Sequence, residues 1–179
     1  MTSASMATED PLAASRTSRA LVAVLRIGVA VLWIQNLGWK NPPSFGQGDP
    51  PSGLHEFTRW AVDYPVFPPY SWAVEHVVLP NFTVFAWGVL LAEAALGAFL
   101  LIGLATRFFA VLGLAQTLAI TFSVANAPNE WLWSYLLMLL THGAIFATAA
   151  GRYGGLDGVL RPRWLGAEGR LARFLAVAS

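Results

Sequence analysis

The sequence predicts an all-α membrane protein, a four-transmembrane-helix bundle with a long outer loop between helices 1 and 2. Three observations predict this fold. Hydrophobic residues make up 56% of the 179 residues, charged residues make up 12%, and the mean hydropathy is +0.55, which lies outside the range of soluble domains. The apolar residues gather in four runs, each close to the roughly 20 residues that cross a bilayer. No long polar block remains for a separate soluble domain.

Polar residues bound the four apolar runs, and each run is a predicted span. The runs cover residues 20–37, 82–104, 108–125 and 131–150. Only Ala105, Thr106 and Arg107 separate the second run from the third, so these two helices form a tight antiparallel hairpin. Pro128, flanked by asparagines, makes the next turn.

Basic residues predict the orientation, because arginine and lysine stay on the cytoplasmic side. Most of them precede the first span, lie between the second and third, or follow the fourth: Arg16, Arg19, Arg107, Arg152, Arg161, Arg163, Arg170 and Arg173. The outer side receives only Lys40 and Arg59. Both termini are therefore expected in the cytoplasm. Residues 1–18 would form a disordered tail, 19–157 the transmembrane domain, and 158–179 an amphipathic tail on the anionic inner leaflet.

The outer loop, residues 38–80, is too long for an ordinary connection. It begins as a Pro/Gly coil and then contains two short amphipathic pieces, residues 54–62 and 71–78, split by prolines. Its second half is rich in aromatic residues, so we expect it to lie on the membrane or to cap the bundle. A packed lid without chemistry and a functional surface are both compatible with this pattern.

Each predicted span carries one strongly polar side chain near mid-depth, and these are Arg26, Glu93, Gln116 and His142. At 1.5 Å per residue, Glu93 lies about 15 Å and His142 about 16 Å from the outer ends of their spans. Arg26 lies about 10 Å and Gln116 about 13 Å from the inner ends. Ionisable residues inside a membrane are costly and mark candidate functional sites. Arg26 is the predicted partner of Glu93, because a guanidinium can hold a carboxylate with two parallel hydrogen bonds.

Two interpretations of this polar set stay open. In the first, the four side chains are a clasp that orients the helices through interhelical hydrogen bonds. In the second, they surround a quinone ring. Arg26, Gln116 and His142 would then bind the quinone, and Glu93, His142 and Arg26 would be catalytic, since a carboxylate and an imidazole can deliver the two protons that quinone reduction takes.

The composition also bears on other cofactors and partners. The chain contains no cysteine, so it holds no thiolate metal site and no dithiol relay, and electrons must come from outside. The neighbours His55 and Glu56 in the outer loop do not converge on one ion in a helix, and no metal site is expected. Nucleic acid is not an expected partner, because the basic residues are few and placed to meet lipid.

The segment GRYGGLD, residues 151–157, ends the last predicted span. Gly151 suits the left-handed residue that terminates many helices. Asp157 can then cap a short helix or pair with Arg107 or Arg152.

Three stretches resemble the DoxX/DoxD family of small four-helix membrane proteins. LLAEAALGAFLLIGLATR, residues 90–107, resembles the family's second helix, and GRYGGLD is similar to the ending that follows its last helix. The first span is similar too, with Arg26 near its start and Gly38 and Lys40 near its end. The resemblance covers nearly all of residues 20–160. Six residues of this sequence occupy positions that match the family's pattern: Arg26, Lys40, Glu93, Arg107, Arg152 and Asp157.

The resemblance implies a four-helix bundle and, in the DoxD branch, a subunit of thiosulfate:quinone oxidoreductase, which passes electrons from thiosulfate to a membrane quinone. We therefore expect a multi-pass protein of the bacterial plasma membrane, with quinone as the cofactor and with the lipid bilayer and a membrane or peripheral redox subunit as partners. The alternatives are a noncatalytic anchor or assembly subunit, a small-solute carrier, and a homo-oligomer of any of these.

Overall fold

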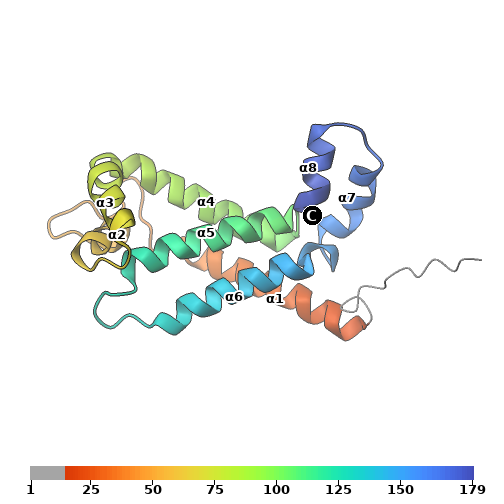
Figure 1. The fold of residues 1–179 in the computed structure, drawn as a ribbon, viewed down its shortest axis with the longest axis horizontal. Coiled ribbons are helices and arrows are strands. Elements are labelled where there is room, and N and C mark those ends of the chain that lie inside the picture. Colours follow the sequence, from red (N-terminus) through yellow and green to blue (C-terminus); the bar gives the residue numbers. More distant parts are fainter. Residues whose placement is uncertain (1–14) are drawn as a thin grey trace, which may run out of the picture.

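The long helices of this protein lie side by side in an elongated bundle (Figure 1). A computed structural model describes residues 15–179, and every regular element in that part of the chain is helical. The bundle helices are α1 (Arg16–Gln35), α4 (Phe82–Ile102), α5 (Thr106–Val124) and α6 (Leu132–Thr148). Contacts join α1 to α4, α4 to α5, α5 to α6, and α6 back to α1. The four helices therefore enclose a common interior.

Short helices cover the two ends of the bundle (Figure 1). At one end, called the loop end below, lie α2 (Gly53–Asp63) and α3 (Pro68–Ala73). At the other, called the arginine end because Arg19, Arg107 and Arg152 lie there, are η4 (Ala150–Arg152), α7 (Leu156–Leu165) and α8 (Arg170–Ala178). The start of α1 and the end of the chain also lie at the arginine end.

Three helices in the described part of the chain are long and apolar enough to cross a membrane, and they are Arg16–Gln35, Pro68–Ile102 and Thr106–Val124. A fourth apolar helix, α6, has 17 residues. Many apolar side chains on these helices face outward and are exposed, for example Val24, Val84 and Leu140. This outward apolar surface is what a bilayer requires of a bundle that it surrounds.

The first helix begins earlier than the sequence predicts. α1 begins at Arg16, inside the segment expected to be a disordered tail, because the hydroxyl of Ser15 accepts a hydrogen bond from the amide of Ser18 at 3.0 Å and caps the helix. The remaining residues of that predicted tail, 1–14, lie outside the described residues.

The second span is longer than predicted and shortens the outer loop. Its helix runs without a break from α3 through a π-helical turn, η2 (Val74–Val78), and a 3₁₀ turn, η3 (Leu79–Asn81), into α4. The predicted second amphipathic piece, residues 71–78, is thus the start of this helix and not a separate one. Pro80 sits in the first positions of the 3₁₀ turn, where its missing N–H costs least.

The loop end has a small apolar core of its own, made by Phe45, Leu54, Phe82 and Ala86. Phe45 is 1% exposed and packs edge-on against Trp87, with 5.3 Å between ring centroids. The loop before α2 and α2 itself are therefore folded down onto α4 and also contact α5. The segment caps the bundle, one of the two placements expected from its aromatic residues.

Candidate functional site

A buried ion pair joins the loop end of α1 to the middle of α4. The Nζ of Lys40 lies 2.5 Å from Oε2 of Glu93, and each side chain is only 1% exposed. Lys40 also donates to the backbone carbonyl of Asn36 at 2.9 Å and lies 4.2 Å from the ring centroid of Trp39. Burial lowers the pKa of Lys40, and the neighbouring Glu93 acts in the opposite direction. The lysine is thus desolvated and depends on its carboxylate partner.

Two amides complete the surroundings of the Glu93 carboxylate. Asn36 Nδ2 donates to Oε2 and Gln116 Nε2 donates to Oε1, each at 3.2 Å. Trp39 fixes the Asn36 amide, because the indole N–H can only donate and it reaches Oδ1 of Asn36 at 2.9 Å. Glu93 therefore receives donors from α5 and from the segment that follows α1, which begins with the C-cap residue Asn36. This set of four residues, Lys40, Glu93, Asn36 and Gln116, is called the carboxylate cluster below.

Arg26 does not pair with Glu93, contrary to the sequence prediction. Its Nη1 donates to the carbonyls of Leu100 and Leu101 at 2.6 and 3.0 Å, and its Nη2 donates to the carbonyl of Gly154 at 3.3 Å. The last carbonyls of a helix have no partner within that helix, and the fully buried guanidinium supplies them at the end of α4. Arg26 therefore belongs to the arginine end, far along α4 from Glu93.

His142 is held between two partners and takes a defined tautomer. The indole N–H of Trp33 donates to its Nε2 at 2.9 Å, so Nε2 carries no proton and Nδ1 must carry it. Nδ1 then donates to the carbonyl of Met138 at 2.7 Å. Both ring nitrogens of His142 are thus occupied. The ring also lies directly against Gly113 of α5, where any side chain would overlap it.

The GRYGGLD segment ties the arginine end together. Asp157 does not pair with Arg107 or Arg152 and does not cap its own helix. Its two carboxylate oxygens accept from the backbone amides of Ala105 and Thr106, at 2.7 and 2.9 Å. Asp157 thus caps the start of α5 from 51 residues away in the chain and closes the α4–α5 hairpin against the end of α6.

The four side chains predicted to meet at mid-depth therefore fall into three groups. Glu93 and Gln116 contact each other, His142 contacts Trp33, and Arg26 lies at the arginine end. Counting depth along the spans did not identify Trp33 or Asn36. Trp33 lies on the same helix as Arg26, and Asn36 caps the end of that helix. Lys40 was marked only by the resemblance. Among residues 15–179, no group of three or more histidine or acidic side chains is placed to hold a metal ion.

The apolar exterior, the helix lengths and the buried polar groups define a multi-pass helical membrane protein. The DoxX family model matches residues 51–126, so this region of the chain is similar to the DoxX family. The matched region runs from α2 to the end of α5 and includes Glu93 and Gln116. No curated protein and no solved structure matches the chain.

Proposed function

We propose that the protein is the integral membrane subunit of a quinone-linked redox complex of the thiosulfate:quinone oxidoreductase type. The observation that carries the proposal is the buried pair of Lys40 and Glu93. An acid and a base that are desolvated together inside a membrane protein are typical of sites that take up and release protons. The resemblance to the DoxX/DoxD family, with an aromatic outer loop and a GRYGGLD ending that lean toward the DoxD branch, supplies the reaction class.

The proposed topology has four spans, with α6 as the fourth. At 1.5 Å per residue, its 17 residues measure about 26 Å, slightly less than the hydrocarbon core. The highly exposed Trp131 and Trp133 at its start would extend the span into the interface, where tryptophan is enriched. The arginine end would face the cytoplasm of a bacterial cell with both termini, and the loop end would face outward.

The carboxylate cluster can serve a quinone as a proton-exchanging site. A quinone accepts two electrons and two protons when it is reduced. Oε1 of Glu93 accepts a single hydrogen bond, from Gln116, and a carboxylate oxygen can accept a second. Lys40 would stabilise the ionised carboxylate, and Asn36 and Gln116, the two amides that donate to it, are half-buried. The electrons would come from a partner subunit, since this chain has no cysteine to carry them.

Arg26 and His142 fit a quinone poorly. Both terminal nitrogens of the Arg26 guanidinium donate to backbone carbonyls, and both nitrogens of His142 are engaged by Trp33 and Met138. This saturation favours a second candidate function, a noncatalytic membrane anchor or assembly subunit in which the polar groups hold the helices. The two candidates share the membrane placement and differ in whether Glu93 exchanges protons.

Gentle extraction from the native membrane tests the first candidate. Mass spectrometry then identifies the proteins and quinones that travel with the chain. A stoichiometric redox subunit and a bound quinone are expected, with the quinone lost in Glu93→Gln while the partner stays. A partner without quinone in the wild type would favour the anchor, and a chain accompanied only by phospholipid would contradict both candidates.

A further inference from the structure

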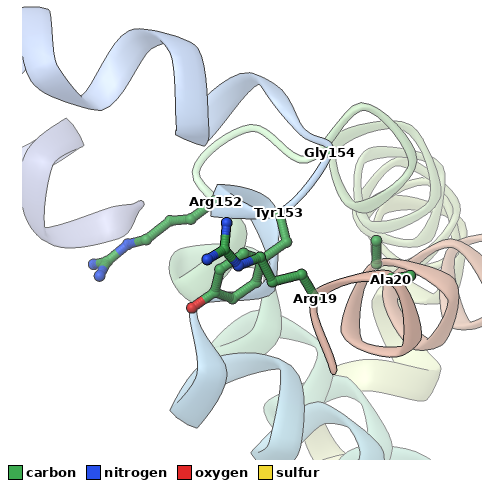
Figure 2. Close-up of a pocket in the computed structure, with 6 residues that line it drawn as sticks. Arg19, Ala20, Arg152, Tyr153 and Gly154 are labelled. Atoms are coloured by element: carbon green, nitrogen blue, oxygen red, sulfur yellow. The ribbon is translucent and has the colours of Figure 1, made fainter. Parts of the chain in front are cut away.

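The arginine end holds two adjoining pockets that share one residue, Arg152. The first, about 310 Å³, lies between α1 and the turn after η4 and is lined by Arg19, Ala20, Ala23, Arg152, Tyr153 and Gly154. Figure 2 shows Arg19 and Tyr153 together in this pocket, with Arg152 extending away from them. The second, about 210 Å³, is lined by Arg152, Asp157, Gly158, Arg161 and Pro162. Arg152 thus passes from one pocket into the other.

Positive charge is concentrated around the second pocket. Burial lowers the pKa of Arg152, and the nearby Arg161 and Arg107 lower it further, while Tyr153 and Asp157 act in the opposite direction. The carboxylate of Asp157 is already used by the amides of Ala105 and Thr106. Arg152 and Arg161 therefore both line this pocket, and Asp157 is the one acidic residue that lines it. Both carboxylate oxygens of Asp157 already accept hydrogen bonds from backbone amides outside the pocket.

Two arginines that line this pocket also have hydrogen-bond donors without acceptors. The Nε atoms of Arg152 and Arg161 are both buried without a hydrogen-bond partner. The Nη2 atom of Arg152 donates to the backbone carbonyl of Ser179, at 2.8 Å. Arginine pairs of this kind bind phosphate through parallel N–H donors.

Exposed apolar residues lie next in the chain to residues that line both pockets. Leu21 and Val24 follow Ala20 and Ala23 of the first pocket, and Leu156 and Val159 stand on either side of Asp157 and Gly158 of the second. A ligand with a phosphate and hydrocarbon chains would satisfy the arginines and cover these residues together. Basic pockets at the ends of transmembrane helices bind lipid headgroups in this way.

We propose that Arg152 and Arg161 bind the phosphate of an anionic phospholipid, with its headgroup extending into the pocket beside Arg19. The site fixes one lipid at the junction of α1, η4 and α7. It stands independently of any quinone chemistry, because no residue of the carboxylate cluster contributes to it.

Native mass spectrometry of the detergent-purified, lipid-depleted full chain tests this site, with phosphatidylglycerol and phosphatidylcholine as probes. The wild type should retain phosphatidylglycerol in preference. Arg161→Gln should weaken that retention about tenfold or more, the usual effect of losing a charge-assisted pair. The matched control is Arg163→Gln, an exposed arginine of the same helix that lines neither pocket, and it should retain the lipid like the wild type.

Three results would overturn the proposal. They are equal retention of the two lipids, equal losses in Arg161→Gln and Arg163→Gln, and binding of inorganic phosphate that displaces phosphatidylglycerol completely, which would make free phosphate the ligand. If Arg161→Gln fails to accumulate, Arg161→Lys replaces it. Lysine keeps the charge without the planar fork, so its retention of phosphatidylglycerol should fall below those of the wild type and Arg163→Gln.

Discussion

Lys40 and Glu93, 53 positions apart in the chain, form an ion pair with 2.5 Å between Nζ and Oε2. The pair connects the segment after α1 to the middle of α4. The side-chain amides of Asn36 and Gln116 also donate hydrogen bonds to the Glu93 carboxylate. Removing one member of a buried pair leaves the other charge uncompensated, whereas removing both charges together can be nearly neutral. Substituting one or both members of the pair therefore tests whether the two side chains interact in the carboxylate cluster.

Lys40→Met should destabilise the protein strongly, by about 3–5 kcal/mol, because it leaves the Glu93 carboxylate buried without its cation. The double variant Lys40→Met, Glu93→Gln should recover much of that loss. Thermal unfolding midpoints in detergent check the prediction. Losses that simply add in the double variant would show that the two side chains do not interact.

Gly113→Ala should destabilise the bundle by about 1–3 kcal/mol, the usual cost of overpacking, because the added methyl group would overlap the ring of His142. Gly143→Ala on α6 is the matched control, since its added methyl group meets nothing within 4 Å. The control should change stability little or raise it by up to about 1 kcal/mol. Similar midpoints for the two variants would contradict the close approach of α5 and His142.

Asp157→Ala should cost about 1–3 kcal/mol, because the amides of Ala105 and Thr106 then lose their acceptors in a buried position. Asp157→Asn keeps one acceptor oxygen and should lie between the wild type and the alanine variant. The exposed Glu168→Ala serves as the control. The order of the unfolding midpoints tests the cap, and an Asp157→Ala midpoint equal to that of the control would argue against it.

His142 should carry its proton on Nδ1. The chain has three histidines, so ¹⁵N-histidine labelling gives few NMR signals, and His142→Gln assigns the one of interest. The spectrum should show a protonated Nδ1 and a bare Nε2 that changes in Trp33→Phe, where the indole donor is lost. A proton on Nε2 in the wild type would rule out the hydrogen bond from Trp33.

The hydrophobic runs and the polar residues between them predicted the ends of the bundle helices to within a few residues, because span length follows from bilayer thickness. The boundary before α4 was harder to predict, since Pro80 usually ends a helix and here sits in a 3₁₀ turn that continues it. The α6 span ends at Thr148, before the predicted limit, because Ala149 takes a left-handed conformation.

The polar contacts were predicted less well, for a geometric reason. Counting residues gives the depth of a side chain along a helix and leaves open which neighbour it faces. Arg26 was therefore assigned to Glu93, although the free carbonyls at the end of α4 compete for it. Lys40 lies beyond the end of the predicted first span, and its long side chain nevertheless returns to Glu93.

Thiosulfate-driven quinone reduction by the intact complex tests the proposed role of Glu93 most directly. Glu93→Gln should lower the rate per folded complex by about 10²–10⁴-fold, the range expected for a lost proton-transfer group. Its unfolding midpoint should also fall, because Lys40 then stays buried without its carboxylate partner, so rates are compared at equal amounts of folded protein. Glu75→Gln, an exposed carboxylate of the loop end, should keep the full rate. A folded Glu93→Gln protein that reduces quinone at the wild-type rate would contradict the account.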